Sequence, residues 1–181
     1  MGHPLLRMRS EKVDDPASNE VKRLVSNMIS TLNRAKGAGL AAPQVGVLKR
    51  VVIFRVPKER IKEERNSNIV DLTVLVNPKI KILTKKKEMG WEGCLSVPGL
   101  RGIVSRFYSV RYSGYTTDGK KIIREVRGFH ARVVQHECDH LDGVLYPMRM
   151  KDMSSLSFTD QLDPEASDLV QARLDTAGSI R

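Results

Sequence analysis

The sequence predicts an α+β fold, in which antiparallel sheets wrap around one central helix. The order of the elements along the chain leads to this prediction. Strand-like segments between residues 51 and 126 are followed by a single helical segment that begins at residue 128, and strands that precede a helix, rather than alternate with helices, are typical of this class. The length of 181 residues suits one domain, 1–181, with a substantial core.

The first element is a helix over residues 19–36. Its apolar residues recur at helical spacing, at Val21, Leu24, Val25, Met28, Ile29 and Leu32. Ser18 or Asn19 can cap its start, and Gly37 ends it. The helix therefore leads directly into a segment rich in glycine and alanine.

The middle of the chain is predicted to be mostly strand. The strand segments are 51–56, 72–76, 79–83, 108–115 and 121–126. The last two form a hairpin around Thr117-Asp118-Gly119. The charged segment 58–68 is expected to be a loop or a short helix, and the segment 90–102, which contains several glycines and a proline, is expected to be a loop.

The second helix is predicted over residues 128–141 and ends at Asp142-Gly143. The apolar pattern weakens after Lys151, so that a polar C-terminal tail or helix begins at about residue 152. From Asp163 onward the tail is either a docked final helix or partly disordered, and we expect partial order.

The second helix carries the most informative motif, Gln-His-Glu-Cys-Asp-His at 135–140. Positions i and i+4 share one face of a helix, so His136 and His140 can both bind one metal ion. Glu137 stands beside them and can handle the proton of a water molecule. Since a catalytic metal site usually has three protein ligands and one open position, a third ligand is required.

Cys94 is the best candidate for this third ligand. It lies in a Gly/Pro-rich segment, Trp-Glu-Gly-Cys-Leu-Ser-Val-Pro-Gly at 91–99, from which a side chain can project into a cleft. Cys138 lies about 200° around the helix from His136, so we expect it to point into the core. His3, near a terminus, and His130, on the opposite side of the helix, are weaker candidates.

A third segment, Gly-Ala-Gly-Leu-Ala-Ala-Pro-Gln-Val-Gly at 37–46, joins the first helix to the first strand. Its small residues let the backbone approach a ligand, so Ala38 and Gly39 can offer backbone groups to an extended peptide. The Gln44 amide can donate a hydrogen bond to an oxyanion. The segment is not a dinucleotide-binding motif, because it lacks the third glycine and follows a helix.

These three segments together resemble the peptide deformylase family, in the family's order and spacing, over residues 1 to about 150. The resemblance implies a metal-dependent hydrolase that removes the N-formyl group from the formylmethionine of nascent polypeptides and releases formate. It also implies the same α+β architecture around a central metal-binding helix. The expected partner is an N-formylmethionyl nascent peptide.

The resemblance assigns roles to the matching residues. Cys94, His136 and His140 are expected to hold one metal, and Glu137 to act as the catalytic acid–base. The oxyanion is expected to receive hydrogen bonds from Gln44 and from the Leu95 backbone N–H. Ferrous iron is the implied native metal, with nickel, cobalt or zinc as substitutes, although the ligand types alone suggest zinc.

The substrate pocket is expected beside His136. Phe129 and Val133 lie seven and three residues before His136, on its face, and either line a pocket for the methionine side chain or belong to the ordinary core. Arg132 falls near the same face, where the resemblance leads us to expect an apolar residue.

The segment around Cys94 supplies further expected contacts. Glu92, Gly93 and Arg101 are expected to lie at the substrate site, with Glu92 and Arg101 forming an ion pair that braces the segment. Arg101 is also expected near the carbonyl groups of the substrate. Asp139 and Asp142 either orient a ligand histidine or cap the helix.

Composition limits the setting. No run of about 18 apolar residues exists, so we expect no membrane span. Only two cysteines, one of them a candidate thiolate ligand, and the absence of a leader pattern favour a reducing compartment. We expect this compartment to be the cytoplasm of a bacterium. The net charge of +10 either favours the ribosome surface or is a solvated basic surface, and without interleaved aromatic residues we expect no direct nucleic-acid specificity.

Two alternative functions fit parts of the pattern. A metallopeptidase can carry the same His-Glu-x-x-His helix, but it typically uses a third His or Glu in place of a residue such as Cys94. A catalytically silent, metal-stabilised binding module of the same fold would be expected to have lost Glu137 or Gln44, and both are present.

Overall fold

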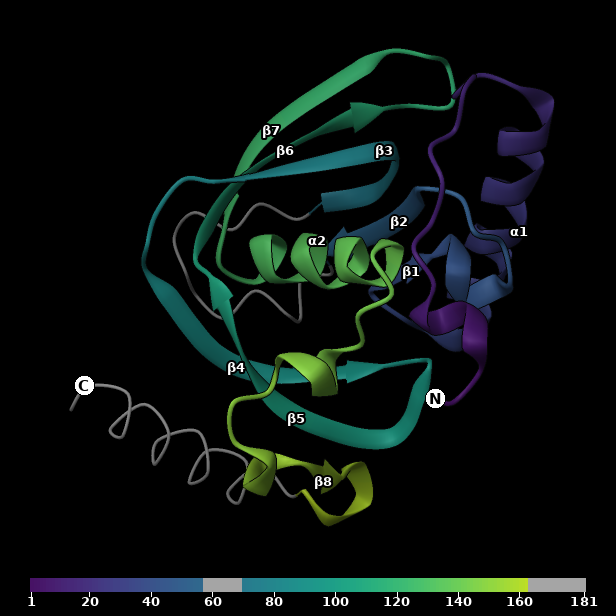
Figure 1. The fold of residues 1–181 in the computed structure, drawn as a ribbon. Coiled ribbons are helices and arrows are strands. Elements are labelled where there is room, and N and C mark those ends of the chain that lie inside the picture. Colours follow the sequence, from purple (N-terminus) through teal and green to yellow (C-terminus); the bar gives the residue numbers. More distant parts are fainter. Residues whose placement is uncertain (57–69, 163–181) are drawn as a thin grey trace.

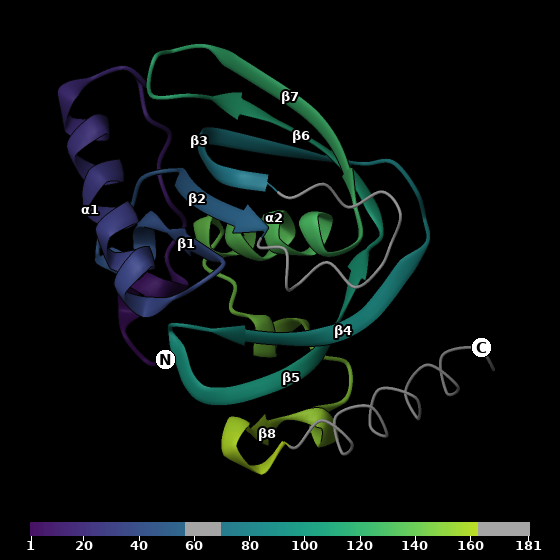
Figure 2. The ribbon, with the colours of Figure 1, turned by 180° about the vertical axis from the view of Figure 1, so that it is seen from behind.

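The computed structural model describes residues 1–56 and 70–162. The helix α2 lies between a larger sheet and a smaller sheet, as Figure 1 shows from one side and Figure 2 from behind. The larger sheet has the strand order β1-β2-β3-β6-β7 and the smaller one β4-β5-β8, and every neighbouring pair is antiparallel. The α+β fold and the central helix predicted from the sequence are confirmed.

The bounds of the elements follow the chain from the N-terminus. The helices are α1 (Asn19–Ala35) and α2 (Gly128–Leu141), with short 3-10 turns η1 (Pro4–Arg7), η2 (Ala42–Val45), η4 (Tyr146–Arg149), η5 (Met153–Ser155) and η6 (Thr159–Gln161). The strands are β1 (Gly39–Ala41), β2 (Val51–Val56), β3 (Val70–Ile82), β4 (Lys87–Cys94), β5 (Val97–Phe107), β6 (Ser109–Tyr115), β7 (Lys121–Arg127) and β8 (Ser157–Phe158).

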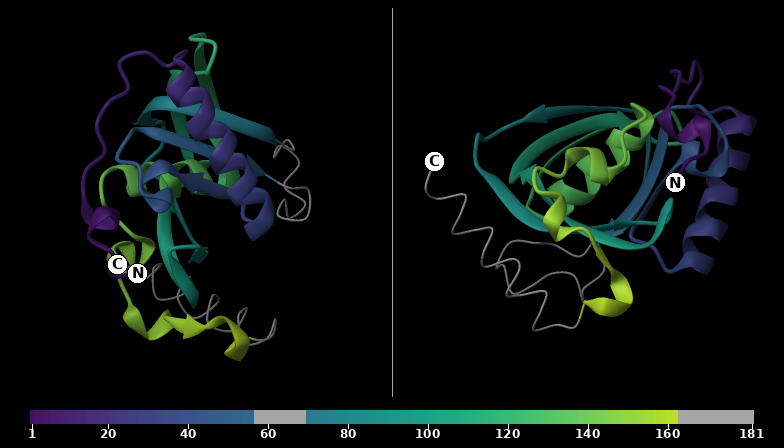
Figure 3. Two further views of the ribbon diagram at one scale, coloured as in Figure 1. Left: turned by 90° about the vertical axis from the view of Figure 1, so that its right-hand side faces the viewer. Right: turned by 60° about the horizontal axis from the view of Figure 1, so that its bottom comes forward.

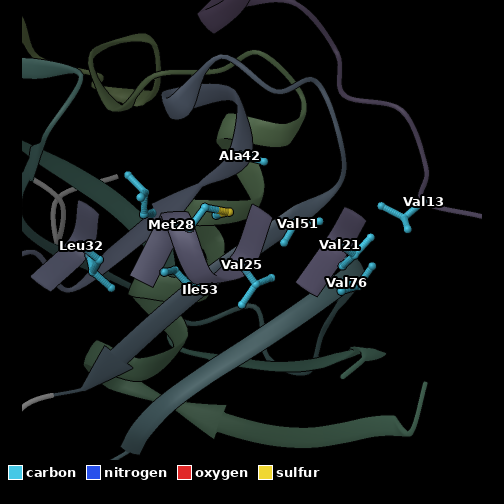
Figure 4. Close-up of a cluster of buried hydrophobic side chains, with 10 residues drawn as sticks. Val13, Val21, Val25, Met28, Leu32, Ala42, Val51, Ile53 and Val76 are labelled. Carbon is cyan, nitrogen blue, oxygen red and sulfur yellow. The ribbon is translucent and has the colours of Figure 1, made fainter. Parts of the chain in front are cut away.

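The helix α1 covers the outer face of the larger sheet, as the left view of Figure 3 shows. The Ser18 hydroxyl accepts a hydrogen bond from the backbone N–H of Val21, so the predicted capping residue starts the helix. Lys36 ends it in the left-handed conformation, with φ 51°. The apolar face packs on β2 and β3 in the cluster of Figure 4, and the chain then enters the segment 37–46.

The strand β2 is apolar on both faces, so one face packs against α1 and the other packs against α2. Val51 and Ile53 belong to the cluster beneath α1, whereas Val52 and Phe54 belong to a second cluster around α2. Cys138 packs in this second cluster and is 8% exposed, as expected for a core residue. The predicted bounds of α2 are confirmed.

The segments 72–76 and 79–83, predicted as two strands, lie in the single strand β3 except for Leu83, since β3 ends at Ile82. Asn77 takes φ 52°, and the pairing register between β3 and β6 shifts between Val76 and Lys79. The Asn77 side chain accepts a hydrogen bond from the Val13 N–H at 2.9 Å and donates one to the Val13 carbonyl at 2.8 Å. The strand therefore continues through Asn77-Pro78 because a bulge accommodates the proline.

The prediction of a loop over residues 90–102 is wrong, since this segment belongs to the β4–β5 hairpin. Two of its glycines, Gly90 and Gly102, mark close approaches of side chains from outside the hairpin. A Cβ atom on Gly90 would lie 2.8 Å from Cζ of Arg132, and one on Gly102 would lie 2.5 Å from Sδ of Met150. At these two positions glycine is used because space is lacking.

The remaining predictions have mixed outcomes. The strand 51–56 and the hairpin β6–β7 are confirmed. The segment 58–68 and the tail from residue 163 lie outside the described residues. Residues 153–161 contain η5, β8 and η6, and β8 pairs with β5. Within the described ranges, no helix has the length and apolar character needed to cross a membrane.

His130 lies on the face of α2 that packs against the larger sheet, with its ring 5.7 Å from the rings of both Phe54 and Tyr112. Burial lowers the pKa of His130 from 6.5 to about 4. Between these two pH values the unfolded chain binds a proton that the folded chain does not, so stability should fall as pH drops through this window. The variant His130→Phe should lose less stability than wild type over the same window in urea titrations. Equal pH slopes would contradict this assignment.

Candidate functional site

Cys94, His136 and His140 come together at the buried side of α2. One ligand atom from each residue lies within 4.8 Å of the other two. The Sγ atom of Cys94 is 3.2 Å from Nε2 of His140. The helix α2 supplies both histidines through their i, i+4 spacing, and the end of β4 supplies the cysteine.

His140 presents Nε2 to this group, whereas Nδ1 of His136 is occupied by Glu92. Nδ1 of His136 is 2.8 Å from Oε2 of Glu92, which fixes the orientation of the ring. Burial alone would lower the pKa of His136, but its hydrogen bonds with Cys94 and Glu92 raise it to about 10 in the metal-free protein. Burial lowers the pKa of His140 to about 3, so its ring is neutral. A metal would therefore displace a proton from His136.

Glu137 lies beside the group and is 4% exposed. Its Oε2 atom has no hydrogen-bond partner among the described residues. Burial raises the pKa of Glu137 to about 7. A carboxylate with an unpaired oxygen and a pKa near neutrality is suited to accept and return a proton.

Gln44 is held with its amide nitrogen facing the group. Its Oε1 atom accepts a hydrogen bond from the Ala41 N–H at 2.8 Å, which fixes the side chain. Its Nε2 atom is 3.5 Å from Sγ of Cys94 and donates to Oγ of Ser96 at 3.1 Å. The donor end of the amide is thus directed at the site.

A cavity of about 380 Å³ opens beside these groups. It brings together all the residues expected from the sequence except His140: Ala38, Gly39, Gln44, Glu92, Gly93, Cys94, Leu95, Arg101, Phe129, Val133, His136 and Glu137. Phe129 and Val133 line this cavity and also pack against the core around α2.

Comparison with known proteins decides the family. The model of the polypeptide deformylase family matches residues 1–155. The chain belongs to the polypeptide deformylase family.

Relatives in this family match most of the chain. Peptide deformylase 1 of Nitrosomonas europaea is 48% identical over 91% of this chain and 92% of its own length, and peptide deformylase 1 of Bordetella pertussis is 50% identical over 91% and 93%. The crystal structure of a class I type b peptide deformylase from Acinetobacter baumannii with bound Met-Ala-Ser is 35% identical, with a TM-score of 0.74, over 82% of this chain and 95% of that one.

Glu92 is paired differently from the expectation. Its Oε1 atom accepts hydrogen bonds from Nε of Arg106 and from Nη1 of Arg132, both at 2.9 Å, and no ion pair with Arg101 is found among the described residues. Arg101 lies opposite Gly93 in the β4–β5 register, so these two residues share one face of the hairpin. Glu92 precedes Gly93 in β4, so its side chain lies on the opposite face from that of Arg101. The predicted Glu92–Arg101 pair is therefore wrong.

The network around Glu92 also explains its charge. Burial alone would raise the pKa of Glu92, but hydrogen bonds from His136 and Arg106 hold it well below its usual range. The carboxylate that contacts Nδ1 of His136 is Glu92, whereas Asp139 pairs with Arg106 and Arg149. Asp142 pairs with Arg50 near the end of α2.

Sequence reasoning missed Arg106 and the buried role of Arg132. Arg106 is 5% exposed, and nothing in its local sequence distinguishes it from a surface arginine of a strand. A usable indication existed for Glu92, because a metal-binding histidine commonly forms a hydrogen bond with a carboxylate through its other ring nitrogen, and Glu92 lies in the same segment as the candidate ligand Cys94.

The open edge of β1 faces the cavity. The Arg55 N–H donates to the Ala38 carbonyl at 2.8 Å. Because hydrogen-bonded and non-hydrogen-bonded pairs alternate in an antiparallel ladder, the N–H and C=O of Gly39 point away from β2. These two groups are available to an extended peptide, which could add to this edge as a strand.

Gly39 also leaves space for Glu137. A Cβ atom on Gly39 would lie 2.1 Å from Oε1 of Glu137. The variant Gly39→Ala should displace this carboxylate and lower kcat for deformylation on the order of 10²-fold, the cost of a misplacement near 1 Å. Metal content, measured in parallel, should remain that of wild type. A kcat within about twofold of wild type would show that Glu137 tolerates the shift.

Proposed function

We propose that the protein removes the N-formyl group from the N-terminal formylmethionine of nascent polypeptides and releases formate, using one divalent metal held by Cys94, His136 and His140. Removal of this formyl group is the activity of the family to which the chain belongs, and the chain is a hydrolase of that class. The observation that carries the assignment of residues is the Cys/His/His group beside the buried, half-unpaired carboxylate of Glu137.

The donor set fits a divalent transition metal. One thiolate and two imidazoles are ligands that such ions accept, and their atoms lie close enough to share one ion. When bound, the metal would polarise the formyl carbonyl and lower the pKa of a water molecule to about 7. We infer ferrous iron as the native metal, with nickel, cobalt or zinc as substitutes, from the resemblance of the motifs.

Glu137 would move the proton. Its carboxylate accepts a proton from the attacking water and then gives it to the nitrogen of the leaving amine. A pKa of about 7 suits both transfers near neutral pH. Its burial beneath Gly39 keeps bulk water away from the carboxylate.

Gln44 and Leu95 would stabilise the charge that develops on the formyl oxygen. The Nε2 group of Gln44 already faces Cys94, and its carbonyl end is fixed by Ala41. Leu95 lies in the turn between β4 and β5 and lines the cavity, where its backbone N–H can donate. Donors fixed before the reaction lower its barrier because they need no reorientation.

The cavity would hold the first residues of the substrate. The open edge of β1 at Ala38 and Gly39 would bind the peptide backbone, and Phe129 and Val133 would contact the methionine side chain. Further contacts would come from Glu92, Gly93 and Arg101, with Arg101 near the substrate carbonyls. The A. baumannii relative binds Met-Ala-Ser, a peptide that begins with methionine.

We further infer that the reaction takes place in the cytoplasm of a bacterium, where formylated chains leave the ribosome. The net charge of +10 favours approach to the negatively charged ribosome surface. A metallopeptidase function is not favoured, because the candidate third ligand is Cys94.

Formate release from a formyl-Met tripeptide tests the proposal. Protein purified without oxygen and loaded with Fe(II) should release formate, and a chelator that removes the metal should abolish the activity. Addition of Fe(II), Ni(II) or Co(II) should restore it, whereas internal peptide bonds in the same peptide should remain intact. Folded, metal-loaded protein that releases no formate would overturn the proposed function.

A further inference from the structure

Arg132 is a buried arginine on α2, at a position where an apolar residue was expected. Its side chain is 11% exposed. The guanidinium donates hydrogen bonds to four acceptors: Oε1 of Glu92 at 2.9 Å and the carbonyls of Val104 at 2.8 Å, Glu88 at 2.8 Å and Gly90 at 3.2 Å. All four acceptors belong to the β4–β5 hairpin, so a single side chain ties α2 to both strands of that hairpin.

The candidate metal group depends on how this hairpin is held against the helix. Cys94 belongs to β4, whereas His136 and His140 belong to α2. The distance between the thiolate and the two imidazoles is therefore set by contacts between the two elements. A shift of the hairpin would move one ligand relative to the other two.

Two arginines cross between these elements in opposite directions. Arg132 reaches from α2 to Glu92 on β4, and Arg106 reaches from β5 to Asp139 on α2. Both arginines also meet at Oε1 of Glu92, whose other oxygen contacts His136. The carboxylate is thus held from both sides.

The helical spacing explains why these contacts lie together. Arg132, His136 and Asp139 stand at positions i, i+4 and i+7, which form one stripe of a helix. His136 is therefore flanked on the same face by Arg132, which pairs with Glu92, and by Asp139, which pairs with Arg106. The chain also leaves room for the guanidinium, since a Cβ atom on Gly90 would lie 2.8 Å from its Cζ atom.

We propose that Arg132 is a positioning residue of the metal centre. It holds the hairpin that carries Cys94 at a fixed place relative to His136 and His140, and it shares Glu92 with Arg106 so that the carboxylate stays on Nδ1 of His136. It acts through these residues and not on the substrate. The inference rests on the proposed metal-dependent function.

The test uses the full chain loaded with Co(II), whose visible spectrum reports the ligands and their geometry. The variant Arg132→Met keeps the length of the side chain and removes all four hydrogen bonds. The rate at which a chelator extracts Co(II) should rise by about 10- to 100-fold, as for the loss of groups that orient metal ligands, and the thiolate bands should shift. The variant Arg132→Lys can reach only some of the acceptors, so its extraction rate should lie between those of wild type and Arg132→Met.

The matched control is Arg111→Met, which removes an arginine that pairs with Glu125 and is 43% exposed on β6. Its extraction rate and spectrum should equal those of wild type. Thermal unfolding of the metal-free proteins separates positioning from a structural role, because a structural role alone would lower the midpoint and leave the Co(II) spectrum unchanged.

A second variant keeps the inference testable if Arg132→Met does not fold. The change Gly90→Ala pushes the guanidinium away without altering any charge, and it should accelerate extraction in the same direction. Extraction rates within about twofold of wild type in the folded variants would overturn the role of Arg132, since loss of a ligand-orienting contact typically costs more. Failure of wild type itself to retain Co(II) would instead overturn the proposed metal site.

Discussion

The variant Glu137→Gln is expected to lower kcat for formate release by roughly 10²- to 10⁴-fold, the usual contribution of general acid–base catalysis. Glutamine has nearly the same shape as glutamate, so the packing of this side chain against Gly39 should be kept. The amide cannot accept the proton of the attacking water or return it to the leaving amine. The effect should therefore fall on kcat, with little change in KM.

Metal content must be measured in the same samples, because the residue adjoins His136. It should equal that of wild type, since Glu137 is not one of the three grouped ligands. The matched control is Asp118→Asn, which neutralises an exposed carboxylate in the turn between β6 and β7 and should leave kcat unchanged. A folded, metal-loaded Glu137→Gln protein that keeps more than about a tenth of wild-type kcat would contradict the proton-transfer role.

The variant Glu92→Ala is expected to lower the free energy of unfolding of the metal-free protein by about 3–5 kcal/mol, the typical cost of breaking a buried ion pair. The Glu92 side chain is 4% exposed, and those of Arg106 and Arg132 are 6% and 11% exposed. Its removal would leave two buried guanidinium groups with too little negative charge nearby. It would also free Nδ1 of His136, so the affinity for metal should fall as well.

Urea titration of the two metal-free proteins measures the first effect. The control is Glu125→Ala, which removes a carboxylate that also pairs with an arginine but is 57% exposed. Its cost should be about 0–1 kcal/mol, as for surface ion pairs. A Glu92→Ala protein whose stability differs from wild type by no more than this control would show that the buried network contributes little to the fold.

The parts of the fold that the sequence predicted correctly rest on local patterns. The helix α1 was predicted from its apolar spacing and its capping residue Ser18, and the hairpin β6–β7 from two strand-like segments around a turn. Both patterns reflect interactions between residues that are near in the sequence, or the simple need to bury one face. Such requirements produce the same local sequence pattern in any tertiary context.

The hairpin β4–β5 was missed because two of its glycines accommodate side chains that are distant in the sequence. Gly90 makes room for Arg132, which is 42 positions away, and Gly102 makes room for Met150. In the sequence alone, a glycine that accommodates a neighbour is indistinguishable from a glycine that turns the chain. The same limitation led to the wrong pairing of Glu92.

The sequence by itself determined the metal-ligand candidates His136 and His140 and the acid–base candidate Glu137, because helical spacing is a local property. It also determined the candidate Cys94, because its residue type and the Gly/Pro-rich segment around it are local properties. Only the tertiary structure decided that Glu92 is shared by His136, Arg106 and Arg132, and that Gly39 lies against Glu137. These contacts join segments from different elements, and their partners are chosen by strand register and by the way the hairpin packs on α2. Neither leaves a pattern in the sequence near the residues concerned.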